Sequence, residues 1–505
     1  MQQQQQVPVL VAGAGPVGLT LALRLAQLGV PVQVWEREDR SRGEGSKALC
    51  MQRETLESWA QLGFGQQVAD RGVAWALGRT YFRDTELFQT RLPATDEHFP
   101  PFVNISQTEV EQLLVAAVHD EPLVTVHWGR SVTDLTSEPS GVAVDSADGV
   151  RRTAGYVVGA DGARSSIRRL AGIGFPGHSH ADQFLIVDIR ARLPFPAERR
   201  FWFDPPWNPG RTVLIHPQPD DVWRIDWQVP PEFDLDSERS SGRLDERIRQ
   251  IVGTADYEPV WVTVYRFHQR LAERIAAGRT VLVGDAAHLF SPFGARGLNS
   301  GVADAMNLAW RLAEAVQRPG AAEDLLAGYA RERTGAAAEN LAVTDATMRF
   351  MVPPTEDDRR ARDAVLLGSV DDPAMRARVD SGRLAVPAVY QVPGAGPVAV
   401  GDVVVGGVLP DAPVEPVRAT AARRLREALG GRWCRLLLWG GEVAPAAQHR
   451  GHAPECQVHV LGADERVPPG VDPVVRDRTG RVAARLGSTP RPVLVRPDGY
   501  VVQDR

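Results

Sequence analysis

The chain has 505 residues and a mass of 55.1 kDa, which is enough for about two to four domains. Hydrophobic residues make up 43% of it, charged residues 24% and aromatic residues 7%, as in ordinary soluble globular proteins. The 57 basic and 63 acidic residues give a net charge of −6, so the chain lacks the positive field that nucleic acid or an anionic membrane would require. We therefore expect neither of these partners.

The three cysteines, Cys50, Cys434 and Cys456, are too few for a disulfide framework or a cysteine-rich metal site, and they fit a reducing cytoplasm. No apolar run approaches the roughly 18 residues that span a membrane. The N-terminal residues also lack the basic segment of an export signal. A cytoplasmic protein without a membrane span or a resident metal is predicted.

A strand, a turn, a helix and a second strand are predicted over residues 7–35. Glycines at the turn positions permit a tight turn, let the backbone approach a pyrophosphate and let the helix pack on the strand, so that the helix N-terminus faces the phosphates. The turn residues expected to bind a dinucleotide are Gly13, Gly15, Pro16, Val17 and Gly18.

Three acids follow predicted strands of this fold. Glu36 ends the second strand, eighteen residues after Gly18, where an acid accepts hydrogen bonds from a free ribose hydroxyl and favours FAD or NAD over NADP. Asp161 and Asp285 each follow a further buried strand that ends in Gly-Asp or Gly-Ala-Asp. Since ligands of open α/β sheets bind at the carboxyl ends of the strands, we expect these acids at one dinucleotide site.

Residues 176–270 have a different pattern, in which apolar and polar side chains alternate and most of the tryptophans occur. The run from Trp223 to Val229 predicts an antiparallel sheet with one wet or ligand-facing side. The nucleotide fold resumes at residue 280 and includes a helix from about Asn299 to Gln317. A charged helical segment, a Pro/Gly-rich linker at 392–397 and a small α/β domain complete the chain.

In this order, the glycine-rich turn, Gly159-Ala160-Asp161-Gly162 and Gly284-Asp285 resemble the FAD fold of the para-hydroxybenzoate hydroxylase type, the class A flavoprotein monooxygenases. The resemblance covers about residues 7–350. The C-terminal part, which includes Val493–Tyr500, looks like the thioredoxin-like domain of phenol hydroxylase relatives, although it lacks the Cys-x-x-Cys of thioredoxin chemistry. That domain is expected to have a packing role or to form a homodimer.

The implied fold class is α/β: a Rossmann-like FAD-binding domain, an inserted antiparallel-sheet substrate domain and a thioredoxin-like C-terminal domain. The predicted limits are 1–175 with 271–350 for the FAD domain, 176–270 with part of 75–103 for the substrate domain, 351–395 for a helical segment and linker, and 396–505 for the C-terminal domain.

The resemblance also implies roles for single residues. Asp285 matches the acid that holds the ribityl chain, and the loop from Ser291 to Asn299 matches the one along the flavin ring. Backbone N–H groups at the start of the following helix would face the flavin N1 and C2 carbonyl and favour the negative charge of reduced flavin. In this loop Arg296 replaces the usual glutamine. The residues assigned to the flavin by the resemblance are Lys47, Gln107, Asp285, Pro292, Gly297, Leu298 and Asn299. For Lys47 and Gln107, the role of an ordinary polar surface residue is the open alternative.

No second Gly-x-Gly-x-x-Gly occurs, so a hydride donor and a substrate would share one flavin. The resemblance implies that NADH or NADPH reduces FAD, that O₂ adds to give a C4a-hydroperoxide, and that its distal oxygen attacks an electron-rich aromatic ring. The protein would orient the substrate and exclude water.

A base that forms a phenolate would speed this attack, and His216 and Asp226 on strands of the inserted domain are the candidates. A satisfied sheet histidine and a surface Arg-Asp pair are the structural alternatives. The aromatic residues between Phe201 and Trp227 fit either a substrate pocket or a core, and His288 is expected to be structural because no second ligand has metal spacing. A function of another class also fits: a catalytically silent flavin or quinone binder that acts through its C-terminal domain.

Overall fold

The computed structural model describes residues 7–39, 48–92, 96–391, 399–400, 403–439, 456–467, 472–486 and 492–502. The chain forms two compact units. The first contains Met1–Pro93 and Pro101–Ala385, and the second contains Ala94–Pro100 and Val386–Arg505. Among the described residues, no helix is both long enough and apolar enough to cross a membrane.

The first sheet of the larger unit has a parallel core with the order β18-β11-β1-β2-β8. Its strands are β1 (Val7–Ala12), β2 (Val32–Trp35), β8 (Val124–His127), β11 (Arg151–Gly159) and β18 (Thr280–Leu282), with antiparallel β9 (Val132–Glu138), β10 (Gly141–Ser146) and β17 (Ala276–Ala277) at its edges. The strand β1 and the second half of β11 are buried and almost entirely apolar, as expected for parallel strands that are covered on both faces.

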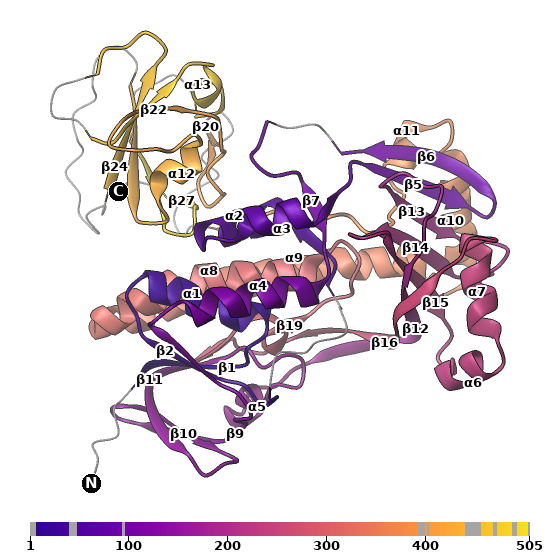
Figure 1. The fold of residues 1–505 in the computed structure, drawn as a ribbon, viewed down its shortest axis with the longest axis horizontal. Coiled ribbons are helices and arrows are strands. Elements are labelled where there is room, and N and C mark those ends of the chain that lie inside the picture. The colour runs from indigo at the N-terminus through magenta and orange to yellow at the C-terminus, as the bar shows by residue number, and fades with distance from the viewer. Residues whose placement is uncertain are drawn as a thin grey trace. The chain divides into compact units, whose positions relative to one another are not determined.

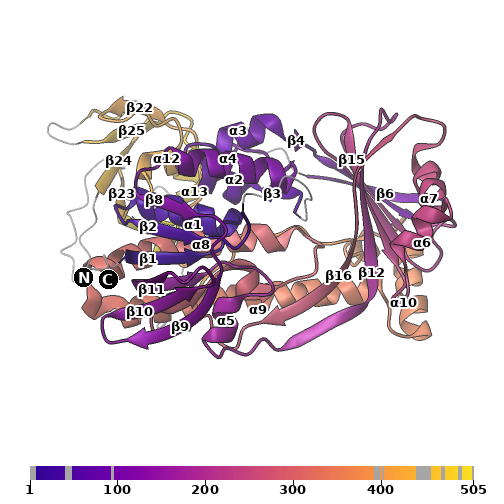
Figure 2. The ribbon, with the colours of Figure 1, turned by 60° about the horizontal axis from the view of Figure 1, so that its bottom comes forward.

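Three helices lie side by side next to this sheet (Figures 1 and 2): α1 (Pro16–Gln27), α4 (Gln107–His119) and α8 (Arg296–Gln317). Helix α1 begins with Pro16, whose fixed φ suits a first helical position. Helix α8 packs closely on it, since a Cβ at Gly301 would lie 2.5 Å from a Val17 methyl carbon. The short helix α5 (Ser166–Leu170) follows β11.

The second sheet has the order β19-β16-β12-β15-β14-β13-β5-β6. Its strands are β5 (Leu77–Phe82), β6 (Thr85–Arg91), β12 (Gly177–Arg190), β13 (Arg199–Phe203), β14 (Thr212–Pro217), β15 (Val222–Val229), β16 (Glu258–Leu271) and β19 (His288–Leu289). Neighbours are antiparallel except β5 and β13, which pair in parallel. The long strands β12 and β16 lead from the first sheet into the second (Figure 2).

The two faces of the second sheet have different surroundings. Trp223, Ile225 and Trp227 of β15 pack into an apolar core with α7 (Arg243–Val252), while α6 (Leu235–Ser240) precedes that helix. The polar side chains that alternate with them turn to the other face, which lines a cavity. The predicted alternation of this run is therefore present, and its polar side faces a cavity rather than bulk water.

A small third sheet joins these parts. It has the order β3-β7-β4 and consists of β3 (Cys50–Gln52), β4 (Val73–Ala74) and β7 (Phe102–Asn104), next to α2 (Arg53–Gln61) and α3 (Gly65–Arg71). The buried Asn104 side chain accepts a hydrogen bond from Trp75 Nε1 at 3.0 Å and donates one to the Pro217 carbonyl at 2.9 Å. The end of β14 is thus fixed against β7.

The larger unit ends with helices α9 (Ala322–Met351), α10 (Glu356–Gly368) and α11 (Pro373–Arg376). The second unit has a mixed sheet of the order β22-β25-β24-β23-β26-β27. Its elements are β20 (Ala399–Val400), β21 (Val403–Val404), β22 (Glu415–Arg418), α12 (Leu425–Leu429), β23 (Cys434–Leu438), β24 (Cys456–Gly462), β25 (Val474–Asp477), α13 (Arg481–Leu486), β26 (Pro492–Val495) and β27 (Val501–Val502).

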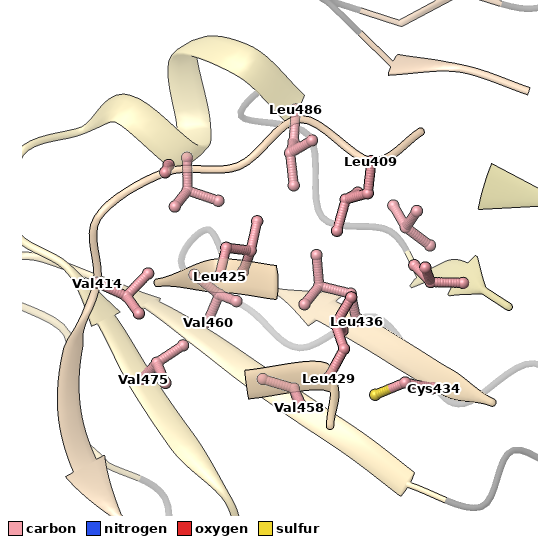
Figure 3. Packing of buried hydrophobic residues seen from close by; sticks show 14 of the residues in the cluster. Leu409, Val414, Leu425, Leu429, Cys434, Leu436, Val458, Val460, Val475 and Leu486 are labelled. Atoms are coloured by element: carbon pink, nitrogen blue, oxygen red, sulfur yellow. The ribbon is translucent and has the colours of Figure 1, made fainter. Parts of the chain in front are cut away.

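The core of the second unit is apolar, with Leu425, Leu436 and Val460 among its buried side chains (Figure 3). Cys434 and Cys456, distant in the sequence, are register partners on the parallel strands β23 and β24. The thioredoxin-like class of this unit and the predicted domain limits stay predictions.

A buried ion network holds the end of β18 against α8. Asp304 of α8 accepts hydrogen bonds from the Gly284 amide at 2.8 Å and from Arg333 Nε at 2.6 Å, and it pairs with His288 Nε2 at 2.7 Å. Burial would raise the pKa of Asp304, but His288 and Arg333 lower it to about 2. Asp304 is therefore a carboxylate at neutral pH, and His288 has the structural role expected for it.

Replacing this carboxylate tests the network. Asp304→Asn leaves Arg333 buried without its partner, so we expect the free energy of unfolding to fall by about 3–5 kcal/mol, measured by urea denaturation. Glu258→Gln, which removes a pair with Arg190 at 3.0 Å on an exposed surface, serves as the control and should change it by less than about 1 kcal/mol. Equal effects of the two variants would contradict this role.

Candidate active site

A cavity of about 530 Å³ extends from the turn after β1 to the polar face of the second sheet. Its lining comes from the ends of β1, β11 and β18 and from β12, β14, β15 and β16. The residues predicted for cofactor or catalysis that line it are Gly13, Gly15, Pro16, Val17, Glu36, Gln107, Asp161, His216, Asp226, Asp285, Pro292, Gly297 and Leu298.

The three glycines of the first turn are needed for different reasons. Gly13 has φ +109°, and a Cβ there would lie 2.4 Å from the Ala160 carbonyl oxygen. A Cβ at Gly18 would lie 2.0 Å from the Gly13 carbonyl oxygen. A Cβ at Gly15 would meet no protein atom within 4 Å, and this open side belongs to a residue that lines the cavity. Gly13 and Gly18 serve packing, whereas Gly15 leaves room for a ligand.

Glu36 connects the turn to the next strand end. Its carboxylate accepts hydrogen bonds from the amides of Ala14 at 2.8 Å and Glu38 at 3.0 Å. A carboxylate has about four lone-pair positions, so two backbone bonds leave acceptor capacity for a ligand hydroxyl. The residue stands where the sequence placed a ribose partner.

The two later acids differ from each other. Asp161 accepts hydrogen bonds from the Ser166 and Ile167 amides at 2.6 and 3.1 Å, so one of its oxygens caps the start of α5, while the buried Oδ1 has no partner among the described residues. Asp285 is exposed at the cavity, directly after Gly284. Of the two, Asp285 has the side chain that a ligand can reach more directly.

The loop after β19 brings a second helix N-terminus to the cavity. Ala295 has φ +55° and caps α8, which begins at Arg296. A Cβ at Gly297 would meet no protein atom within 4 Å, and Gly297 and Leu298 line the cavity. The first amides of a helix have no partner within the helix, so this N-terminus favours a negatively charged ligand group.

Residues 380–385, which we call the strap, are hydrogen-bonded to this loop. The Ala385 amide donates to the Gly294 carbonyl at 3.0 Å, and Arg296 Nη2 donates to the Arg383 carbonyl at 3.0 Å. Arg296 Nη1 also donates to Asn340 of α9 at 2.5 Å. The unusual arginine of the loop thus fastens the strap, of which Gly382 and Leu384 line the cavity.

Of the predicted site residues that the structure describes, Gly18 and Asn299 do not line the cavity. Gly18 packs against Gly13, as described. The Asn299 side chain is buried and accepts hydrogen bonds from the Gln52 amide at 3.1 Å and Thr55 Oγ1 at 2.8 Å, so it joins α8 to β3 and α2 instead of lining the cavity. Lys47 lies outside the described residues.

At the end of the cavity formed by the second sheet, the strand register places polar and apolar side chains next to one another across neighbouring strands. Asp226 of β15 is flanked by Leu214 of β14 and Ile186 of β12, and Ile186 is paired with Thr263 of β16. All of them line the cavity, together with Phe184, Trp261, Tyr265, Phe267, Leu289 and Phe293. The aromatic residues Phe201, Phe203, Trp223 and Trp227 instead belong to the cores on either side of the sheet.

Asp226 and His216 are half-buried polar groups that form no ion pair within the described residues. Arg224 does not pair with Asp226 but with Asp188, through two bonds of 2.8 Å. Burial raises the pKa of Asp226 to about 7, although Arg224 lowers it. Burial also lowers the pKa of His216 well below its ordinary value. Asp226 Oδ1 and His216 Nδ1 have no hydrogen-bond partner among the described residues, so both can bind a ligand.

Two neighbours of these groups were not found from the sequence. Arg199 of β13 and Cys50 of β3 line the same end of the cavity, and burial raises the pKa of the Cys50 thiol. Arg199 donates through Nη1 to Ser381 Oγ of the strap at 3.1 Å. No local motif marks either residue, because their proximity depends on how β3, β13 and the strap meet.

The chain matches the family model described as FAD binding domain over residues 6–344. It is 34% identical over 349 residues to the rifampicin monooxygenase of Streptomyces venezuelae, which covers 68% of this chain and 71% of that one. The 3-(3-hydroxy-phenyl)propionate/3-hydroxycinnamic acid hydroxylase of Comamonas testosteroni is 30% identical over 370 residues, 72% of this chain and 62% of the relative. This chain thus spans less than two thirds of the second relative.

Among solved structures, CabE, an aromatic hydroxylase from angucycline biosynthesis, is similar with a TM-score of 0.70 and 26% identity over 99% of this chain and 96% of CabE. The matched domain confirms the family, the fold class and the FAD cofactor that the sequence predicted. The cavity agrees with that cofactor, since it has two helix N-termini, an open side at Gly15 and Gly297, and the carboxylates of Glu36 and Asp285 in its lining. The chain therefore belongs to the class A flavoprotein monooxygenases, the aromatic hydroxylase family that carries this FAD-binding domain.

Proposed function

We propose that the protein uses NADH or NADPH and O₂ to hydroxylate a phenolic or similarly activated aromatic compound bound at the sheet end of the cavity. The observation that carries this proposal is the single cavity that joins the dinucleotide motif to an aromatic-lined sheet face. FAD, when bound, supplies the hydride acceptor and the activation of O₂. The residues of the chain bind FAD and the substrate, orient the substrate and exclude water from the cavity.

In the half of the cavity next to the glycine-rich turn, the residues described above would hold FAD. The backbone at Gly15 and the start of α1 would take the pyrophosphate, Glu36 the ribose and Asp285 the ribityl chain. The N-terminus of α8, at Gly297 and Leu298, would lie at the ring system and stabilise negative charge there.

The substrate half combines apolar contact with proton transfer. Phe184, Trp261 and Tyr265 offer flat apolar surface for an aromatic ring. Asp226, with a pKa near 7, suits the acceptance of a phenol proton, which makes the ring more electron-rich. His216 stays uncharged and offers Nδ1 as a hydrogen-bond partner.

Turnover tests the reaction. The purified protein is reconstituted with FAD and assayed for NADH and NADPH oxidation with a panel of mono- and polycyclic phenols, and oxygenated product is identified by mass. We expect at least one phenol to accelerate oxidation and to gain one oxygen atom. Bound FAD with no acceleration and no product from any phenol would contradict hydroxylation and favour a catalytically silent flavin or quinone binder.

Gly15→Val tests the cofactor site. Gly15 has φ −75°, and its open side meets no protein atom, so a valine should fold with a loss of about 1 kcal/mol or less while it fills the space assigned to the pyrophosphate. We expect the variant to purify folded but without flavin colour. The matched Gly13→Val should lose stability itself, because its Cβ would strike the Ala160 carbonyl. Full FAD occupancy in Gly15→Val would contradict this assignment.

Asp226→Asn tests the proton acceptor. Only the carboxylate form accepts a proton, so kcat/KM for a phenol should rise as the pH increases through about 7. The variant should lose about 10²- to 10⁴-fold in kcat/KM and lose this pH dependence. The exposed Asp221→Asn is the control and should keep both. An unchanged pH profile in Asp226→Asn would assign the proton to another group.

The same substitution has a second readout. Because burial raises the pKa of Asp226 from 3.8 to about 7, the folded state is weakened progressively as the pH rises between these values. Asparagine resembles the protonated form, so Asp226→Asn should be more stable than the wild type above about pH 7 and equally stable near pH 3.8. Denaturant unfolding at several pH values measures the difference.

A further inference from the structure

Arg199 is a cation in the substrate half of the cavity without an ion-pair partner. It begins β13, and its guanidinium donates to Ser381 Oγ at 3.1 Å and to the Ser381 carbonyl. Within the described part of the chain, no carboxylate oxygen lies within 4.0 Å of its guanidinium nitrogens. Ser381 accepts from Nη1 and Nη2, so other N–H groups of the five on the guanidinium stay available.

Two buried arginines of this unit are held by carboxylates, whereas the half-buried Arg199 has no such partner within the described residues. Arg224 forms two bonds of 2.8 Å with Asp188, and Arg333 binds Asp304 at 2.6 Å. Removing an unpaired ion from water is unfavourable, and burial accordingly lowers the pKa of Arg199 to about 10. Arg199 still carries its charge at neutral pH.

None of the groups around Arg199 forms an ion pair with it within the described residues, although Asp380 and the ionised form of Asp226 attract it electrostatically. The Cys50 thiol stays protonated because burial raises its pKa, and Asp226 is largely protonated below about pH 7. Asp380 attracts Arg199 electrostatically without a direct ion pair, and its oxygens accept hydrogen bonds from Thr347 at 2.8 Å and the Gly382 amide at 3.0 Å. His216 is uncharged, because burial, Arg199 and Arg224 all lower its pKa.

We propose that Arg199 binds an anionic oxygen of the substrate, so that the preferred substrates carry a carboxylate or an acidic phenol on their aromatic ring system. This inference rests on the proposed function, since it names the substrate class of the same cavity. A planar guanidinium can donate two parallel hydrogen bonds to a carboxylate and one or two to a phenolate oxygen. The apolar side chains beside it, such as Leu214 and Ile186, then contact the ring.

The strap supports this subsite. Ser381 directs the guanidinium, and the strap is itself held by Arg296 and by Asp380. The fixed orientation lowers the conformational entropy lost when an anion binds. The guanidinium of Arg199 therefore has a fixed orientation for binding an oxyanion before the ligand arrives.

Equilibrium dialysis of the FAD-loaded protein tests the proposal without turnover. The carboxylate probe is 2-naphthoate, with 2-naphthamide as its neutral counterpart. The phenolate probe is 4-nitrophenol above its own pKa, with 4-nitroanisole as its neutral counterpart. We expect the wild type to bind at least one anion more tightly than its neutral counterpart, and the pair that shows this preference identifies the source of the oxyanion.

Variants assign the preference to Arg199. Arg199→Gln should weaken binding of the preferred anion by about 10- to 100-fold and leave the neutral counterpart unchanged, while Arg199→Lys should keep part of the preference. The matched control is Arg200→Gln, because Arg200 follows on the same strand but pairs with Glu198 at 2.6 Å and does not line the cavity. Flavin content and circular dichroism check that each variant is folded.

Three results would overturn the proposal: no preference for either anion in the wild type, an equal loss for anionic and neutral probes in Arg199→Gln, or the same loss in Arg200→Gln. Failure of the proposed function is a separate result. A protein that binds the anion through Arg199 but oxygenates nothing keeps the oxyanion subsite and loses the hydroxylase assignment.

Discussion

The close approach of the main chain at the ends of β1 and β11 is the constraint on which the cavity depends. At Gly13 and Gly18, carbonyl oxygens occupy the positions that a Cβ would need, and a Cβ at Gly301 of α8 would meet the Val17 side chain of α1. Because these contacts exclude side chains, the N-termini of α1 and α8 both reach the cavity. Two helix dipoles then point their positive ends toward a ligand that carries phosphates and a reducible ring.

The two halves of the cavity obtain their electrostatic character differently. The dinucleotide half uses backbone amides and exposed acids, which keep their solvation until a ligand arrives. The sheet half uses the uncharged His216 and Cys50, Asp226, which titrates near neutral pH, and the charged Arg199. In such a low-dielectric region a single charge acts strongly on a neighbouring substrate oxygen. Orientation of a ring and adjustment of its protonation can therefore come from the same few side chains.

Much of this architecture could be predicted because it depends on short local patterns. The glycine spacing after β1, the acids at Glu36 and Asp285, and the alternation in β15 each arise from the geometry of one element. Residues whose role depends on tertiary contacts were missed or misplaced. The motif assigned the backbone N–H of Asn299 to the flavin, which stays a prediction, but it did not indicate that the Asn299 side chain would join α8 to β3. Nothing near Arg199 in the sequence indicates that Ser381 will lie beside it.

The parallel pairing of β5 with β13 limits how this protein can be divided. The residues between β12 and β16 do not form a complete sheet by themselves, because β13 would be left as an open edge with unpaired amides and carbonyls. The buried Glu198 would also lose Arg79, which binds it at 2.9 Å from β5. A chimera that takes its substrate-binding sheet from a relative must therefore include the β5–β6 hairpin as well as the later strands. Two separate segments of the sequence have to be exchanged together.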